Sequence, residues 1–299
     1  MDIHLLAFVT VAEERSFTHA AEKLHISQPA ISQHVQTLEK RLDVQLLERN
    51  KRSVRLTKAG EIAYQQAKDI LCSYARMTRL IEDLRGKPSG PLTIGASFTF
   101  GEYVLPHLIA DFRLHYPDVT PIIEIHNTRA VADLVARGQL DIGIIEGSTH
   151  HQHDLAIEPL ASDQLTLVAS SGHPFANQAN ITVEDLNSVP WMIREPGSGT
   201  REITETVFAQ LHLRPAVVQE YASTQLIKES VLAGLGVALL SKWVVHRELQ
   251  WRALVELPFQ SLPVKRTFSV VLKQSNFTAS AVSCFRNYLF EHVPTLSEV

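Results

Sequence analysis

The stretch SQPAISQHVQTLEKRL, residues 27–42, decides the fold of the first part of this chain. Ser27 can cap a helix, and Pro29 fits the first helical turn, where the backbone needs no amide donor. Apolar residues then recur at intervals of four and three, which predicts one buried stripe along the helix. This stripe is expected to consist of Ile31, Val35, Leu38 and Leu42.

The face that this stripe leaves exposed carries short and medium polar side chains. They are Gln28, Ser32, Gln33, Gln36 and Lys40. Such groups can donate and accept hydrogen bonds at base edges, as a recognition helix does in the major groove of DNA. A plain solvent-exposed helix face, which is the alternative, would be richer in Glu and Lys. The pattern therefore favours DNA recognition.

Two helices are expected before this stretch and a basic hairpin after it. Apolar residues at helical spacing predict a first helix around Phe8, and Thr18 to Leu24 predicts a second, so that a tight turn leads into the third. Val44 to Leu47 and Val54 to Thr57 read as two short strands around a basic turn. This hairpin is interpreted as a wing that reaches phosphates or the minor groove.

Charge is unevenly distributed along the 299 residues. The formal net charge is −4, but residues 1–90 carry 14 Lys and Arg against 11 Asp and Glu, a net of +3. The remaining residues therefore carry −7. A phosphate backbone would favour the basic end through counterion release.

The order of motifs in the first sixty residues resembles the LysR-type transcriptional regulators. The matching elements are Phe8, Ser16-Phe17-Thr18, Ala20-Ala21, Leu24, Ser27-Gln28-Pro29-Ala30-Ile31-Ser32, Leu38-Glu39, Leu46-Leu47-Glu48-Arg49 and Leu56-Thr57-Lys58-Ala59-Gly60. The resemblance implies a winged helix-turn-helix. The expected DNA contacts are Gln28, Pro29, Ser32, Gln33, Gln36, Arg49 and Arg52, with Arg52 of the wing entering the minor groove.

A long helix is expected from Thr57, a possible cap, to about Arg85. Its apolar residues form a heptad seam, typical of a helix that pairs with a second helix, although packing on its own domain is an alternative. The seam comprises Ala63, Ala67, Ile70, Tyr74, Met77, Ile81 and Leu84. At least a homodimer is expected, which the resemblance raises to a homotetramer. Gly86 to Pro91 then ends the helix and is interpreted as a hinge.

Strand-like and helical segments alternate after the hinge, which predicts an α/β sheet. The resemblance implies a two-lobed effector domain like the periplasmic binding proteins, so the whole chain is expected to be α/β. The predicted domains are residues 1–58 for the winged helix-turn-helix, 59–90 for the linker helix and hinge, and 91–299 for the effector domain. Lobe I is expected at about 91–162 and 267–299, and lobe II at about 163–266.

Two segments that follow predicted strands are candidates for a ligand site. Residues 95–101 precede a helix expected near Tyr103, and residues 194–201 open another helix. Glycines, hydroxyls and a helix N-terminus together favour a small anion, whereas an ordinary strand-to-helix turn is the alternative. The expected effector-binding residues are Ser97, Phe98, Thr99, Ser198, Gly199, Thr200 and Arg201, and the resemblance adds Thr128, Glu146 and Thr224.

The segment from Glu195 to Arg201, together with Ser-Phe-Thr at 97–99, resembles the LysR-type regulators of cysteine biosynthesis, sulfite reduction and Rubisco operons. That resemblance implies a small anionic co-inducer, either a sulfur oxyanion or a phosphorylated metabolite, and a target in sulfur or central carbon metabolism. Double-stranded promoter DNA is the expected partner, with RNA polymerase as a further candidate. No other cofactor is expected.

The main alternative function is an enzyme that uses the 195–201 loop as an oxyanion or phosphate site. No Walker lysine follows this loop, and no G-x-S-x-G motif occurs.

His150, His151 and His153 lack cysteine or clustered acidic partners, which favours a loop over a metal site. Cys72 and Cys284 suggest no disulfide framework, and a redox role for them stays open.

The sequence contains no run of eighteen apolar residues, and its first residues do not resemble a secretory signal. A cytoplasmic protein without a membrane partner is therefore expected. A solute-binding transport component would share the C-terminal architecture, but it would need an export signal and would not need a DNA-binding head.

Overall fold

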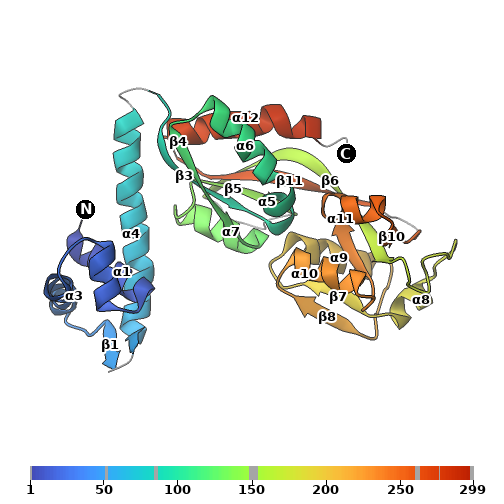
Figure 1. Cartoon of the computed structure of the whole chain (residues 1–299), viewed down its shortest axis with the longest axis horizontal. Coiled ribbons are helices and arrows are strands. Elements are labelled where there is room, and N and C mark those ends of the chain that lie inside the picture. Colours follow the sequence, from blue (N-terminus) through green and yellow to red (C-terminus); the bar gives the residue numbers. More distant parts are fainter. Residues whose placement is uncertain are drawn as a thin grey trace. The chain divides into compact units, whose positions relative to one another are not determined.

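The computed structural model describes residues 2–50, 53–83, 87–147, 154–259, 263–275 and 277–296. Contacts divide the chain into two compact units, residues 1–85 and 86–299 (Figure 1). None of the helices in the described ranges combines the length and the apolar composition that a membrane span requires.

The first unit, called the head below, is a helix-turn-helix followed by a hairpin and a long helix. Its elements are α1 (Ile3–Glu14), α2 (Phe17–Lys23), α3 (Gln28–Leu42), β1 (Leu47–Asn50), β2 (Ser53–Leu56) and α4 (Lys58–Asp83). The Ser27 hydroxyl accepts the backbone N–H of Ala30 at 3.3 Å, which confirms the predicted cap of α3. Phe8, Ile31 and Val35 are fully buried where the first three helices meet.

Two details of the predicted head are wrong. Leu42, expected in the buried stripe, is 51% exposed because α3 ends at this residue and the chain turns away from the core. The first strand begins at Leu47 and not at Val44. The Glu39 carboxylate accepts hydrogen bonds from the N–H groups of Leu46 and Leu47 at 2.8 and 3.2 Å. These two N–H groups therefore bond to a side chain and not to a backbone carbonyl of a neighbouring strand.

The long helix α4 packs on the head only along its first half. The Thr57 hydroxyl accepts the N–H of Gly60 at 2.9 Å, which confirms the predicted cap, and Ala67 is buried in the core of the head. Farther along, the predicted seam is between 42% and 54% exposed at Ile70, Tyr74, Met77 and Ile81. Leu84, the last residue of the predicted seam, lies outside the described residues.

Within its described residues, the second unit is built around a seven-stranded sheet of order β10-β6-β11-β5-β3-β4, with β9 paired to β6. The strands are β3 (Gly90–Ala96), β4 (Val119–Ile125), β5 (Ile142–Glu146), β6 (Leu155–Ser170), β9 (Ala238–Ser241), β10 (Leu254–Glu256) and β11 (Val264–Lys273). Two further strands, β7 (Trp191–Arg194) and β8 (Val218–Tyr221), pair in parallel. The long strands β6 and β11 are antiparallel and run through both lobes.

Helices pack on this sheet at both ends (Figure 1). Lobe I contains α5 (Phe98–Tyr103), α6 (Leu105–His115), α7 (Thr128–Ala136) and α12 (Ser280–Leu296), and lobe II contains α8 (Val183–Ser188), α9 (Gly199–Gln210), α10 (Thr224–Leu232) and α11 (Lys242–Gln250). The predicted two-lobed α/β fold class is therefore confirmed. One predicted boundary is wrong, because α5 already begins at Phe98, where the N–H of Gly101 donates to the Ser97 carbonyl at 2.8 Å.

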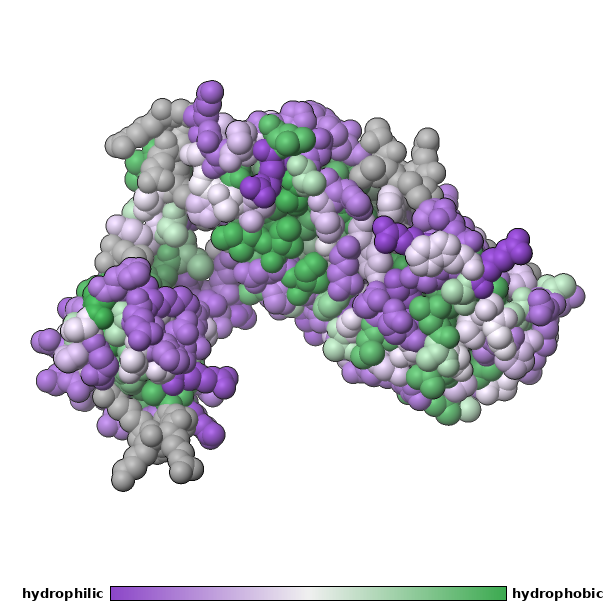
Figure 2. All heavy atoms as spheres, viewed as in Figure 1, coloured by the Kyte–Doolittle hydropathy of each residue, from purple (hydrophilic) through white to green (hydrophobic). Residues whose placement is uncertain are grey.

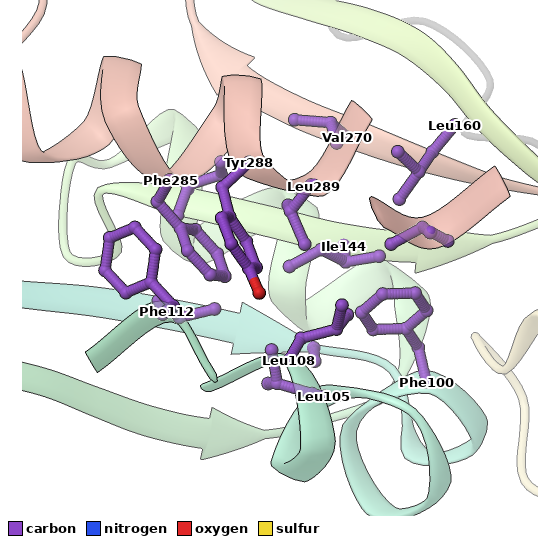
Figure 3. Packing of buried hydrophobic residues seen from close by; sticks show 14 of the residues in the cluster. Phe100, Leu105, Leu108, Phe112, Ile144, Leu160, Val270, Phe285, Tyr288 and Leu289 are labelled. Atoms are coloured by element: carbon purple, nitrogen blue, oxygen red, sulfur yellow. The ribbon is translucent and has the colours of Figure 1, made fainter. Parts of the chain in front are cut away.

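Each lobe has its own apolar core. In lobe I, Phe112 of α6 packs edge to face on Phe285 of α12, with ring centres 5.0 Å apart (Figure 3). In lobe II, Trp191 of β7 packs against Phe208 of α9, with ring centres 4.8 Å apart. Hydrophobic side chains also gather on the visible face of lobe I (Figure 2). Because the cores are separate, β6 and β11 can act as the connection between two stable bodies.

Candidate functional site

The recognition helix α3 presents the polar face that its sequence predicts. Its exposed residues are Gln28, Pro29, Gln33, Gln36 and Lys40, and Ser32 is half-buried. The Gln28 amide donates to the Ser32 hydroxyl one turn along, at 3.2 Å. This face has the hydrogen-bonding groups that readout of base edges requires.

The two basic residues predicted for the wing are only partly described. Arg49 lies in β1, where its backbone is opposite Val54 of β2. Arg52 lies outside the described residues.

In the second unit, the starts of four helices meet between the lobes. Strands β3, β4 and β5 are parallel, so their carboxyl ends lie at one edge of the sheet, and β7 and β8 are likewise parallel. Helices α5, α7, α9 and α10 follow β3, β4, β7 and β8. Ligands of open α/β sheets bind at such carboxyl ends. Two buried arginines, Arg266 and Arg194, connect these helix starts.

Arg266 of β11 is the centre of the first network. Its Nε donates to Asp163 Oδ2 on β6 at 2.6 Å, and the two residues are also backbone partners. Its Nη2 lies 2.9 Å from Glu146 Oε2 at the end of β5. Its Nη1 donates to the Thr200 hydroxyl at 2.9 Å, and Nη2 donates to the Thr99 hydroxyl at 3.0 Å. One guanidinium therefore joins the first turn of α5 in lobe I to the first turn of α9 in lobe II.

This network is almost completely buried, and it contains more carboxylates than guanidinium groups. The side chains of Arg266, Asp163 and Glu146 are at most 2% exposed. Among the described residues, two carboxylates share this one guanidinium, which leaves a formal charge of −1. A buried charge is tolerated only with close partners, so this group depends on each of its members.

Arg194, the last residue of β7, makes the second network. Its Nε and Nη2 donate to the two oxygens of Glu195 at 2.7 and 2.8 Å, and Nη1 donates to the Thr224 hydroxyl at 2.7 Å. Its guanidinium lies 4.2 Å from the centre of the Phe98 ring of α5. Burial alone would raise the pKa of Glu195, but the hydrogen bonds and charge of Arg194 hold that pKa below its ordinary value.

The loop before α9 is held against lobe I by its backbone. The N–H of Arg129 donates to the Gly197 carbonyl at 3.1 Å, and Gly197 has a positive φ of 91°. A Cβ on Gly199 would lie 2.1 Å from the Glu146 carbonyl oxygen. Thr128 also donates to this oxygen, at 2.8 Å. Glycine at 199 therefore lets α9 begin directly on the end of β5.

Two serines at these helix starts have unsatisfied hydroxyls. Ser97 precedes α5 and Ser198 precedes α9, but neither side chain caps its helix. They are only 1% and 4% exposed. Within the described ranges neither hydroxyl has a hydrogen-bond partner, and neither does Glu146 Oε2, whose contact with Arg266 is an ion pair without hydrogen-bond alignment. A buried polar group without a partner costs about 1–3 kcal/mol, so a polar ligand that bonded to these atoms would be stabilised.

The structure does not bring Arg201 to this cluster. Its Nε lies 2.5 Å from Glu205, and its Nη1 contacts Glu220 at 3.2 Å and the Arg194 carbonyl at 2.8 Å. Thr200 and Arg201 are consecutive on α9 and so point about 100° apart. The other predicted effector residues lie in or beside the two arginine networks.

Sequence reasoning missed Arg266 and Asp163. A usable signal was present, because alternate residues of a strand share one face. Arg266 alternates with the buried Phe268, and Asp163 alternates with the buried Leu165. Opposite charges on the inward face of two long strands would have indicated a buried pair.

The family models cover nearly the whole chain. Residues 3–61 match the lysR family of bacterial regulatory helix-turn-helix proteins, and residues 85–294 match the LysR substrate binding domain. This chain is a LysR-family transcriptional regulator. The enzyme alternative is therefore wrong, because the matched families and relatives are transcriptional regulators.

Relatives of this LysR regulator confirm the branch that the motifs indicate. The HTH-type transcriptional regulator CysL of Bacillus subtilis is 39% identical over 89% of each chain. A probable RuBisCO transcriptional regulator of Synechocystis is 36% identical over 92% of this chain and 81% of that one. A full-length OxyR variant from Pseudomonas aeruginosa is 29% identical, with a TM-score of 0.67 over 96% of this chain and 92% of that one.

Three further features of the sequence concern histidines, a glycine-rich turn and the two cysteines. His150, His151 and His153 lie outside the described residues. The segment 234–240 leads from α10 into β9. No disulfide joins Cys72 to Cys284 in the part of the chain that the structure describes.

Proposed function

We propose that this LysR regulator binds a small anionic effector at the polar cluster between its lobes, and that occupancy changes how its heads contact DNA. The observation that carries the proposal is the pair of buried, unpartnered hydroxyls of Ser97 and Ser198 at helix starts of opposite lobes. Helix α9 has twelve residues, so its first turn presents amide donors and partial positive charge. These features together favour an anion.

The arginines of the site support a small ligand with few charges. Arg194 is already paired with Glu195, and Arg266 is paired with Glu146 and Asp163. The attraction for an anion would therefore come from hydroxyls and backbone amides and not from a free guanidinium. A sulfur oxyanion or the acidic group of a phosphorylated metabolite would fit this chemistry.

A ligand held from both sides would stabilise one arrangement of the lobes. Thr99 belongs to lobe I and Thr200 to lobe II. Both hydroxyls accept a hydrogen bond from Arg266, and the Thr200 hydroxyl also donates to Glu146. A ligand shifts a conformational equilibrium by its difference in affinity for the two states. We therefore expect effector binding to change the lobe arrangement and, through the subunit contacts, the spacing of paired heads on DNA.

In the head, we propose that α3 reads base edges through Gln28, Pro29, Ser32, Gln33 and Gln36, while Arg49 and Arg52 contact the phosphates and the minor groove. The exposed polar face of α3 supports the proposed readout of base edges.

The relatives that are named RuBisCO regulators favour a target in central carbon metabolism, and the resemblance to regulators of cysteine biosynthesis favours sulfur metabolism.

We propose that α4 pairs two chains. The apolar side chains of Ile70, Tyr74, Met77 and Ile81 recur with heptad spacing, and all of them are exposed in the single chain. Burial of such a seam against a second copy is the usual way in which a helix of this pattern is stabilised. Further pairing into a homotetramer follows from the family resemblance.

The test is thermal unfolding of the purified protein against sulfite, thiosulfate, phosphate, phosphorylated sugars and O-acetylserine. An anion at a hundred times its Kd should stabilise the protein by about 2.7 kcal/mol. Ser97→Ala and Ser198→Ala should abolish the shift, whereas Ser171→Ala, at an exposed serine of lobe II, should retain it. No shift with any anion, or equal shifts in all variants, would refute the proposed site.

A further inference from the structure

We infer that Glu146 makes the effector site selective for an anion that still carries a hydrogen-bond donor, such as a protonated oxyanion, and that it excludes fully ionised anions. This inference rests on the proposed effector site. It names a residue that determines specificity and the chemical class of the ligand.

Glu146 is fixed directly beside the two unpartnered serines. Its Oε1 accepts the Thr200 hydroxyl at 3.1 Å, and a Cβ on Gly199 would lie 2.8 Å from its Cγ. Gly199 and Thr200 follow Ser198 directly in the chain. Ser97 is tied to the same strand end, because its N–H donates to the Ile144 carbonyl at 2.8 Å. Glu146 and both serines therefore lie where β3, β5 and β7 end.

The second oxygen of this carboxylate has an ion-pair contact but no hydrogen bond among the described residues. Glu146 Oε2 is buried and has no hydrogen-bond donor among the described residues, although Arg266 Nη2 lies 2.9 Å away as an ion-pair partner. An ionised carboxylate can only accept hydrogen bonds, whereas serine hydroxyls and the amides of the first turn of α9 can donate them. A ligand that satisfies the whole set must therefore accept from Ser97, Ser198 and α9 and also donate to Glu146.

The charge of the site points the same way. Glu146 and Asp163 share Arg266, and Arg194 is occupied by both oxygens of Glu195. In the described part of the site, each guanidinium thus already has a carboxylate partner. A fully ionised anion would lie beside the Glu146 carboxylate, and neither Arg194 nor Arg266 would be free to offset the repulsion. An anion with an O–H or N–H group would replace that repulsion by a charge-assisted hydrogen bond.

Small oxyanions offer a sharp test, because sulfate and phosphate share a tetrahedral shape, sulfite has one oxygen fewer, and the three differ in their protons. At neutral pH sulfate carries no proton, whereas phosphate carries one or two and part of the sulfite carries one. A site built to accept a hydrogen bond from its ligand rejects an analogue that lacks the donor by several orders of magnitude. For wild-type protein we expect phosphate or sulfite to bind at least ~100-fold more tightly than sulfate.

The experiment is isothermal titration of the full-length protein with phosphate, sulfite and sulfate, using Glu146→Gln and the exposed control Glu184→Gln. The amide of Glu146→Gln can donate a hydrogen bond and carries no charge, so sulfate should now bind within ~10-fold of the preferred anion. Glu184→Gln, on α8, should keep the wild-type preference. Unchanged exclusion of sulfate in a folded Glu146→Gln variant would overturn the inference.

A second measurement needs no variant. If the hydrogen-bearing form of sulfite is the one that binds, the wild-type affinity for total sulfite should fall ~10-fold per pH unit above the second pKa of sulfite, following the loss of that proton. Sulfate that bound as tightly as phosphate and sulfite would overturn the inference and leave the anion site standing. If none of the three anions bound to wild type or to Glu146→Gln, the inference would be overturned. The thermal-unfolding panel of other anions would still decide the proposed function.

Discussion

Replacement of Arg266 by methionine should strongly destabilise the second unit. Methionine keeps much of the length of the side chain but removes the partner of two buried carboxylates and the donor to Thr99 and Thr200. Breaking a buried ion pair by removal of one partner costs about 3–5 kcal/mol. Since Asp163 and Glu146 are both left without their cation, we expect a loss near the upper end of that range, and a midpoint lower by roughly 10 °C.

The chain offers a selective assay for this loss. Its three tryptophans, Trp191, Trp243 and Trp251, all lie in the second unit, so tryptophan fluorescence during urea unfolding reports on that unit alone. The matched control is Arg286→Met, which removes a half-exposed arginine that pairs with Glu158 on the outside of lobe I. Partly exposed pairs contribute about 0–1 kcal/mol, so this control should be much less destabilised.

A combined variant separates lost attraction from stranded charge. In Arg266→Met with Glu146→Gln and Asp163→Asn, no buried charge of the trio remains, and most of the lost stability should return. If Arg266→Met alone stayed within about 1 kcal/mol of wild type, the buried network would not hold the lobes together. A triple variant no more stable than Arg266→Met would show that the lost contacts of Arg266, and not the unpaired carboxylates, determine the loss of stability.

Further outcomes are expected elsewhere in the molecule. Gln28→Ala should relax base preference at one position of each half-site by about 1–3 kcal/mol in binding assays on randomised DNA, whereas Arg52→Ala should weaken binding to all sequences and lower the salt slope by about one. Met77→Glu should disrupt the α4 seam and yield smaller assemblies in light scattering, but Ser73→Glu, off the seam, should not. The pKa of Glu195 is lowered in the folded state, so its ionised form adds stability above its ordinary value of 4.5, and this stability is lost as the pH falls. The difference in melting midpoint between wild type and Glu195→Gln should therefore shrink below about pH 4.5.

The head could be predicted from sequence because its signals are local. Ser27 and Pro29 mark the start of α3 within a few residues, and the spacing of Ile31, Val35 and Leu38 defines its buried side. The end of that stripe could not be predicted in the same way. Leu42 fits the period, but the helix ends there, and the Glu39 carboxylate takes up the backbone donors that a strand would have used.

The proposed effector site is predictable from sequence only where it depends on strand-to-helix turns. Ser97, Thr99, Ser198 and Thr200 each belong to a short polar segment after a strand, which is the signal that predicts them. The Arg266–Asp163 pair joins residues 103 positions apart, so it depends on the register of β6 against β11, which no local pattern specifies. The sequence predicts Arg201 as a further donor at a helix start after a glycine-rich turn, but its place on α9 turns it toward Glu205 and Glu220.

The residues proposed to bind the ligand are in contact with a buried pair on the strands that connect the lobes. Asp163 is on β6 and Arg266 is on β11, and Arg266 contacts the first turns of both α5 and α9. A ligand that donates to Glu146 and accepts from Ser198 would bind directly to a partner of the Arg266 guanidinium. No further residue would be needed to connect the ligand to this group. Coupling between sites requires contacts that differ between two states, and here those contacts are made at the connection itself. If the proposed site is correct, the lobe arrangement should respond to ligands of few atoms, because a single oxyanion bound at Glu146 would contact a partner of the guanidinium that joins the two lobes.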